Sequence, residues 1–276
     1  MPAVSLEKLK IQSANLVVLS RTPDLFVDNL RDLLDSYADR SRRGPQKVVT
    51  QRFIPSYHVP ERVIWQIEHD LAGRMKNADY GEMTILAQTL WDSPSMEEKL
   101  LAVHLLGLTP FDDVKKWVEI FERWATADLD PFLLTHLVDD GLNHLRRSHF
   151  EAWLALMQEW LKADEAVYIS QGIQSLANFV QADGSRHLPA ILEMLHGIIL
   201  KLPKSVHLET VNLIGTMAKI SPVEMRYFLR ELICEAGVLS RDHQKLLRNL
   251  IDVFPEEDRI EFKRELFARS RTTSTS

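Results

Sequence analysis

The chain has little cysteine and no long apolar run, and each shortage excludes a class of protein. Cys234 is the single cysteine among 276 residues, which excludes an intrachain disulfide and a cysteine metal cluster. Its setting in the apolar run FLRELICEAG predicts a small buried side chain. The longest early apolar run, from Leu16 to Leu19, is far too short for a signal peptide or a membrane span. We therefore expect a protein of the reducing cytoplasm with no membrane partner.

The chain also lacks an excess of positive charge. It has 33 Lys and Arg against 39 Asp and Glu, a net charge of −6, which argues against a protein that coats nucleic acid through bulk charge. A local basic face remains open. The 45% of apolar and 26% of charged residues are typical of a soluble globular protein, and the length is sufficient to bury a core.

No stretch of useful length alternates between apolar and polar residues as a strand does. Proline instead stands at helix starts, beside capping residues and acids. These start signals are Thr22-Pro23, Ser93-Pro94, Thr109-Pro110, Asp130-Pro131 and the capping box Ser221-Pro222-Val223-Glu224. The sequence therefore predicts an all-α protein.

The predicted helices recur with a regular period. Alternate helices begin near residues 60, 94, 129, 164, 204 and 240, a spacing typical of stacked helix pairs. Each pair leaves an apolar face that only its neighbour covers, so we predict an α-solenoid of HEAT-like helical repeats. We expect an N-terminal helical extension over residues 1–45, the repeat domain over 46–269 and a disordered tail over 270–276.

Four short motifs are similar to those of a known family. The segment FIPSYHVPER (residues 53–62) precedes an amphipathic helix, and LWDSP (90–94) precedes an apolar one. AKISP (218–222) and LSR (239–241) match more loosely. Over about residues 46–253 the chain resembles the AlkD-type DNA alkylation repair family. The resemblance implies a HEAT-like solenoid whose basic concave face cradles duplex DNA, and its active members are glycosylases for N3- and N7-alkylated purines.

The resemblance also implies site residues. Asp130 stands where the family has its catalytic carboxylate, while Thr126 replaces the tryptophan four residues before it, and Trp124 lies two positions early. The family's tyrosine, arginine and second tryptophan fall near Lys47, Ser170 and Asn212. Alternatives remain for both candidates: Asp130 before Pro131 suits a helix N-cap, and Trp124 shares an apolar stripe with its neighbours. The aromatic partners of a cationic sugar are thus largely missing.

Basic residues at helical spacing are candidates for phosphate contacts. Candidate nucleic-acid-binding residues are Arg146 and Arg147 at one helix end, Arg226 and Arg230, Arg241, Lys245 and Arg248, and, in the basic segment 40–59, Arg43 and Lys47. His136 and Asp140 share a helix face but lack a third ligand, so we expect no metal and no cofactor.

Three functions are consistent with these observations. The first is duplex DNA binding with weakened or lost N-glycosylase activity on alkylated purines. The second is a non-enzymatic scaffold that holds a protein or peptide on its concave face. The third is an active glycosylase that uses relocated aromatics such as Trp124 or Trp153. The sequence leaves open whether the chain is an enzyme.

Overall fold

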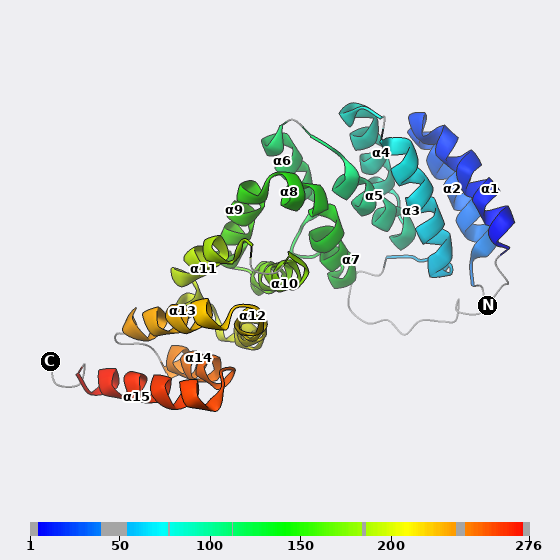
Figure 1. Ribbon diagram of the computed structural model, residues 1–276. Helices are drawn as coiled ribbons and strands as arrows, with labels where there is room; N and C mark the ends of the chain where they lie inside the picture. The colour runs from blue at the N-terminus through cyan, green and yellow to red at the C-terminus, as the bar shows by residue number, and fades with distance from the viewer. Residues whose placement is uncertain are drawn as a thin grey trace. The chain divides into compact units, whose positions relative to one another are not determined.

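The prediction of an all-α protein is confirmed. The computed structural model describes residues 5–39, 54–76, 78–111, 113–183, 186–235 and 241–272, and within these ranges it contains helices and no strand (Figure 1). The chain divides into two compact units, residues 1–153 and 154–276. None of the helices in the described ranges has the length and apolarity needed to cross a bilayer.

Unit 1 is built from eight α-helices and the first residues of a ninth, within the part of the chain that is described. Two irregular turns interrupt them: η1 (Leu19–Arg21) is a 3-10 turn, and η3 (Leu137–Gly141) is a π-helix between α7 and α8. The α-helices are α1 (Leu6–Val18), α2 (Pro23–Tyr37), α3 (Glu61–Met75), α4 (Tyr80–Asp92), α5 (Met96–Leu108), α6 (Val114–Trp124), α7 (Pro131–His136), α8 (Asn143–Ser148) and α9 (Phe150–Leu161), which crosses the boundary.

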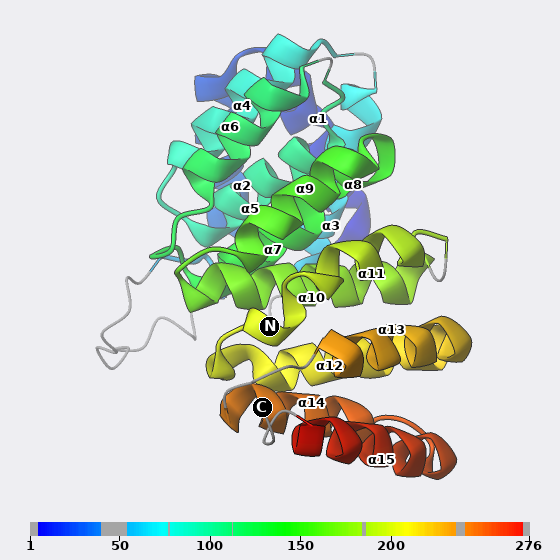
Figure 2. The ribbon, with the colours of Figure 1, turned by 90° about the vertical axis from the view of Figure 1, so that its left-hand side faces the viewer.

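Unit 2 continues the same construction. Its helices are α10 (Ala166–Asp183), α11 (Leu188–His196), α12 (His207–Ile220), α13 (Pro222–Glu235), α14 (Arg241–Asp252) and α15 (Glu256–Thr272), with 3-10 turns η4 (Ile199–Lys201) and η5 (Lys204–Val206). Figure 2 shows α12 to α15 lying side by side as two successive pairs.

The predicted period of helix pairs is confirmed. Helices α3, α5, α7, α10, α12 and α14 begin at residues 61, 96, 131, 166, 207 and 241, each within three residues of the expected position, with the two helices α8 and α9 between α7 and α10. In unit 1, α1, α3, α5 and α7 contact one another in succession, and α2 contacts α4. In unit 2, α10, α12 and α14 form one such row, and α11, α13 and α15 form the other. Unit 2 is therefore a two-row stack in which a helix packs on its second neighbour in sequence, and α1 to α5 and α7 follow the same rule in unit 1, where α8 packs on α5 instead.

The capping predictions hold for α7 and shift for α5 and α6; α6 begins at Val114 with Asp113 as its cap, four residues after Pro110. Asp130 caps α7 and Pro131 is its first residue, as expected. Helix α5 begins two residues after Pro94, because Ser95 rather than Ser93 caps it and forms a capping box with Glu98.

The buried position predicted for Cys234 is wrong. Its side chain is exposed on α13. The buried stripe of that helix follows Met225, Leu229 and Leu232, and Cys234 lies two residues past the last of these, off the stripe.

The predicted segment boundaries remain predictions. Helices α1 and α2 pack on α3 and α4 inside unit 1, and Tyr37 Oη donates to Gln12 Oε1 over 2.7 Å. Helix α15 extends to Thr272, so residues 270–272 of the predicted tail are helical, and residues 273–276 lie outside the described ranges. Of the basic segment 40–59, only residues 54–59 are described.

Candidate functional site

Asp130 acts as the N-cap of α7. Its Oδ1 atom accepts hydrogen bonds from the backbone N–H of Phe132 at 2.9 Å and of Leu133 at 3.2 Å. These bonds satisfy two of the amides that a helix leaves without partners at its first turn. The capping alternative thus has direct geometric support. Its role as a catalytic carboxylate stays a prediction.

Trp124 lies in the core of unit 1. It is the last residue of α6 and is 2% exposed. Its indole stacks on that of Trp91 with the ring centroids 4.4 Å apart and the planes 2° apart. Its Nε1–H donates to Gln88 Oε1 over 3.2 Å. The ring therefore packs α6 on α4, and the other relocated tryptophan, Trp153, is also fully buried.

Two of the predicted phosphate-binding arginines are paired with acids. On α13, Arg226 Nε lies 2.7 Å from Asp258 Oδ2, and Arg230 lies 2.6 Å from Glu261 and 3.6 Å from Glu265. All three acids belong to α15. These carboxylates offset the positive charge of the α13 stripe, which weakens its attraction for a phosphate.

Three other predicted cations are exposed. Arg147 lies in the last turn of α8, and Lys245 and Arg248 lie on α14; within the described ranges none of them meets an acidic side chain. Arg146 is half-buried and its Nη2 reaches Asn143 Oδ1 at 3.5 Å. Arg43 and Lys47 lie outside the described residues, and so does the side chain of Arg241.

A pocket that was not predicted lies in unit 1. Its volume is about 1190 Å³, and its walls come from α3, α5, α7, η3 and the non-helical segment 54–60. Trp65 and Phe132 line it and are 61% and 55% exposed. An open pocket with aromatic walls and a few convergent polar groups is the usual form of a ligand site.

Hydrogen bonds connect the segment 54–60 to the start of α5. Glu97 Oε1 accepts from Ser56 Oγ at 2.7 Å and from the backbone N–H of His58 at 2.9 Å. The N–H of Met96 donates to Pro55 O over 2.8 Å. His58 has a φ of 53°, in the left-handed region that costs a non-glycine residue ~1 kcal/mol or more. The bonds to Glu97 hold the segment against that strain.

The pocket contains titratable groups with shifted pKa values. Burial, helped by the nearby carboxylate of Asp140, raises the pKa of Glu68 to about 7. His136 Nδ1 lies 2.8 Å from Asp140 Oδ2, and this hydrogen bond raises the pKa of His136. Burial lowers the pKa of His104, whose ring is hydrogen-bonded to the backbone of Glu68. A carboxyl group that titrates near neutrality in a cleft is a common mark of a functional site.

The π-helix η3 begins directly after His136 and contains Asp140. Turns of this kind are rare in proteins, and many of them lie at functional sites. The spacing of this pair was visible in the sequence, but Glu68 and His104 were missed because each stands beside a core residue on its helix. Only the packing of α3, α5 and α7 brings the four groups together. The described residues contain no group of three His, Cys, Asp or Glu placed to hold a metal ion.

Comparison with known proteins gives one match. The family model of the DNA alkylation repair enzyme matches residues 30–249. The match begins within α2, upstream of residue 46 where the resemblance was expected to begin, and ends within α14. The searches of curated proteins and of solved structures found no significant match.

Proposed function

Since the chain belongs to the DNA alkylation repair enzyme family, we propose that it binds duplex DNA in alkylation repair and excises alkylated purines poorly or not at all. The observation that carries this proposal is the position of Trp124, which is 2% exposed and stacked on Trp91. A ring enclosed in this way has no free face for an alkylated base.

The chemistry of base excision explains why this position matters. Breaking the glycosidic bond of an alkylated purine builds positive charge on the sugar, which a carboxylate and aromatic faces stabilise. Thr126 stands at the family's tryptophan position and has no ring, and Asp130 Oδ1 already accepts two backbone hydrogen bonds. Together these features support DNA binding without efficient excision.

Duplex binding is supported by the exposed cations Arg147, Lys245 and Arg248. A lysine or arginine without an acidic partner keeps its full charge for a phosphate and releases a counterion on binding. Arg226 and Arg230, which are paired with acids of α15, contribute less.

We expect the Lys245→Ala and Arg248→Ala variants each to weaken duplex DNA binding and to lower the slope of log K against log salt by about 1. Fluorescence anisotropy with a labelled duplex at several salt concentrations measures both quantities. The matched control is Lys263→Ala, which removes the same charge from an exposed lysine that lies 2.7 Å from Asp252. Equal losses in Lys245→Ala and Lys263→Ala, or no binding by the unmodified chain at low salt, would contradict the proposal.

In a base-release assay on methylated duplex DNA, we expect no release above the rate without protein. Asp130→Asn separates the two roles of this residue, because asparagine is as good an N-cap as aspartate but carries no charge. Release by the unmodified chain that disappears in Asp130→Asn would identify Asp130 as catalytic and overturn the proposed loss of activity.

A second candidate function is a scaffold that holds a protein or peptide. The ion pairs of Arg226 and Arg230 favour it, since they reduce the basic character of α13. The anisotropy titration separates the two candidates, because a scaffold of this kind has no salt-dependent affinity for DNA.

A further inference from the structure

The pocket of unit 1 is acidic. The described residues that line it include the carboxylates of Asp39, Glu61, Glu68, Glu97 and Asp140, together with one arginine, Arg62, and three histidines, His58, His104 and His136. Arg62 is exposed, so water screens its charge. These five carboxylates would repel an anion and attract a cation.

The pocket also holds buried acceptor atoms without partners. Glu97 is 5% exposed; its Oε1 atom accepts two hydrogen bonds, and its Oε2 atom is buried with none. The Nε2 atom of His104 is likewise buried and without a partner. Burial favours the neutral ring, and the backbone of Glu68 favours the proton on the other ring nitrogen, which makes Nε2 an acceptor. A buried acceptor without a hydrogen bond is destabilising, so an N–H donor would stabilise both atoms.

Aromatic side chains complete the lining. Trp65 stacks on His69 with the ring centroids 5.4 Å apart, and Phe132 meets His136 edge-on at 4.5 Å. Each leaves more than half of its surface exposed. A cation over the face of tryptophan or phenylalanine is attracted by the ring's negative face.

We propose that this pocket binds an organic cation with N–H donors, namely an alkylammonium or alkylguanidinium group. The N–H groups donate to Glu97 Oε2 and His104 Nε2, and the positive charge lies near Glu68 and Asp140. The alkyl part contacts Trp65 and Phe132. The described lining includes neither Asp130 nor a residue of α14, so the proposal does not rest on the proposed DNA binding.

The geometry gives binding a pH dependence. Glu68 is neutral below pH 7 and charged above it, so a cation binds more tightly as pH rises through about 7. His136, held protonated by Asp140, loses its own charge as pH rises, which acts in the same direction. The other charged or titratable groups among the described residues that line the pocket are His104 and Glu97 on α5, Glu61 and Arg62 on α3, His58, and Asp39 after α2.

Isothermal titration calorimetry of the full chain with n-butylguanidinium tests the proposal, with n-butylurea as the neutral control of similar shape. We expect binding of the cation at pH 8, about 10-fold weaker binding at pH 6, and no measurable binding of n-butylurea. A capped tetrapeptide with one arginine forms a second arm. Tighter binding of the peptide than of n-butylguanidinium indicates that the pocket binds a cationic side chain of a protein. Equal binding indicates that it binds a free small cation.

Two variants localise the site. Trp65→Ala should weaken binding about 3- to 10-fold, whereas Tyr227→Ala, which removes a 64% exposed aromatic from unit 2, should not change it. Glu68→Gln should weaken binding at pH 8 and reduce its pH dependence. Failure of both cationic probes to bind, binding of n-butylurea as tight as that of the cation, or an unchanged affinity in Trp65→Ala would overturn the proposal.

Discussion

Gly107→Ala is expected to destabilise the protein by about 3 kcal/mol or more. A Cβ atom at this position would lie 2.0 Å from the backbone oxygen of Asp140 and 2.9 Å from its backbone carbon. Because both atoms are main chain, no side-chain rotation relieves the overlap. Helix α5 and the π-helix η3 must therefore separate, and their separation disturbs the packed interior of unit 1.

Urea unfolding of the full chain, followed by circular dichroism, measures the effect. The control is Gly73→Ala on α3, where an added Cβ meets nothing within 4 Å. Alanine should stabilise that exposed helical position by about 0.5–1 kcal/mol. A midpoint for Gly107→Ala equal to that of the unmodified chain would show that α5 and η3 can separate at little cost.

Gly107 also shows what a sequence does not reveal. In the run HLLGLTP a glycine before Thr109-Pro110 fits the end of a helix, and nothing local indicates a contact with Asp140, 33 residues later. The helix starts were predictable because capping and proline act over four residues, as Asp130-Pro131 demonstrates. The period of the pairs was predictable because several starts carry such a signal and the apolar stripes place the others.

The candidate site was less predictable because its chemistry depends on contacts between helices. Arg226 and Arg230 looked like a basic stripe, yet their acidic partners lie about 30 residues later on α15. Trp124 is of a residue type that can stack on a base, yet its indole ring is held in the core by Trp91 and Gln88 of α4. Glu68 and His104 acquire shifted pKa values only when α3, α5 and α7 pack together.

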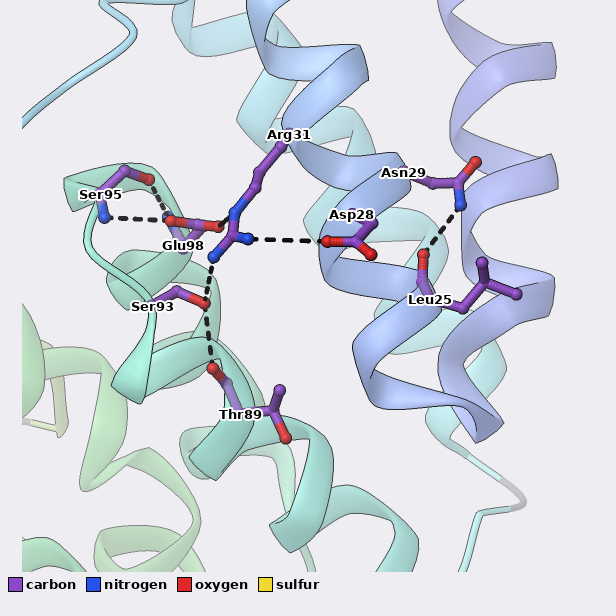
Figure 3. A network of polar contacts seen from close by, with 8 residues as sticks. All are labelled: Leu25, Asp28, Asn29, Arg31, Thr89, Ser93, Ser95 and Glu98. Atoms are coloured by element: carbon purple, nitrogen blue, oxygen red, sulfur yellow. Dashed lines mark hydrogen bonds and ion pairs between the residues drawn. The ribbon is translucent and has the colours of Figure 1, made fainter.

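Arg31→Met is expected to destabilise the protein by about 2–3 kcal/mol. Arg31 Nε donates to Glu98 Oε1 over 2.8 Å, and Glu98 is fully buried (Figure 3). Removing the arginine leaves a buried carboxylate whose remaining hydrogen bond is that from the N–H of Ser95. The expected cost is below that of a fully enclosed pair, because 40% of the Arg31 side chain is exposed.

Asp28→Asn is the matched control for this pair. Asp28 lies 3.6 Å from Arg31 Nη1 and is 73% exposed, so its loss should change the free energy of unfolding by less than about 0.5 kcal/mol. Glu98→Gln in the Arg31→Met background should recover stability, because glutamine keeps the acceptor for Ser95 without a charge.

A double-mutant cycle on Arg31 and Glu98 then measures their coupling. We expect the double variant to be more stable than the sum of the single losses by more than about 1 kcal/mol. The two acids at the start of α5 bind different parts of unit 1. Glu98 pairs with Arg31 of α2, and Glu97 accepts hydrogen bonds from Ser56 and His58 in the segment 54–60. Additive losses in the cycle would mean that Arg31 stabilises the protein through contacts other than Glu98, such as its bond to Ser93 Oγ, and that α5 holds the N-terminal helices without this charge pair.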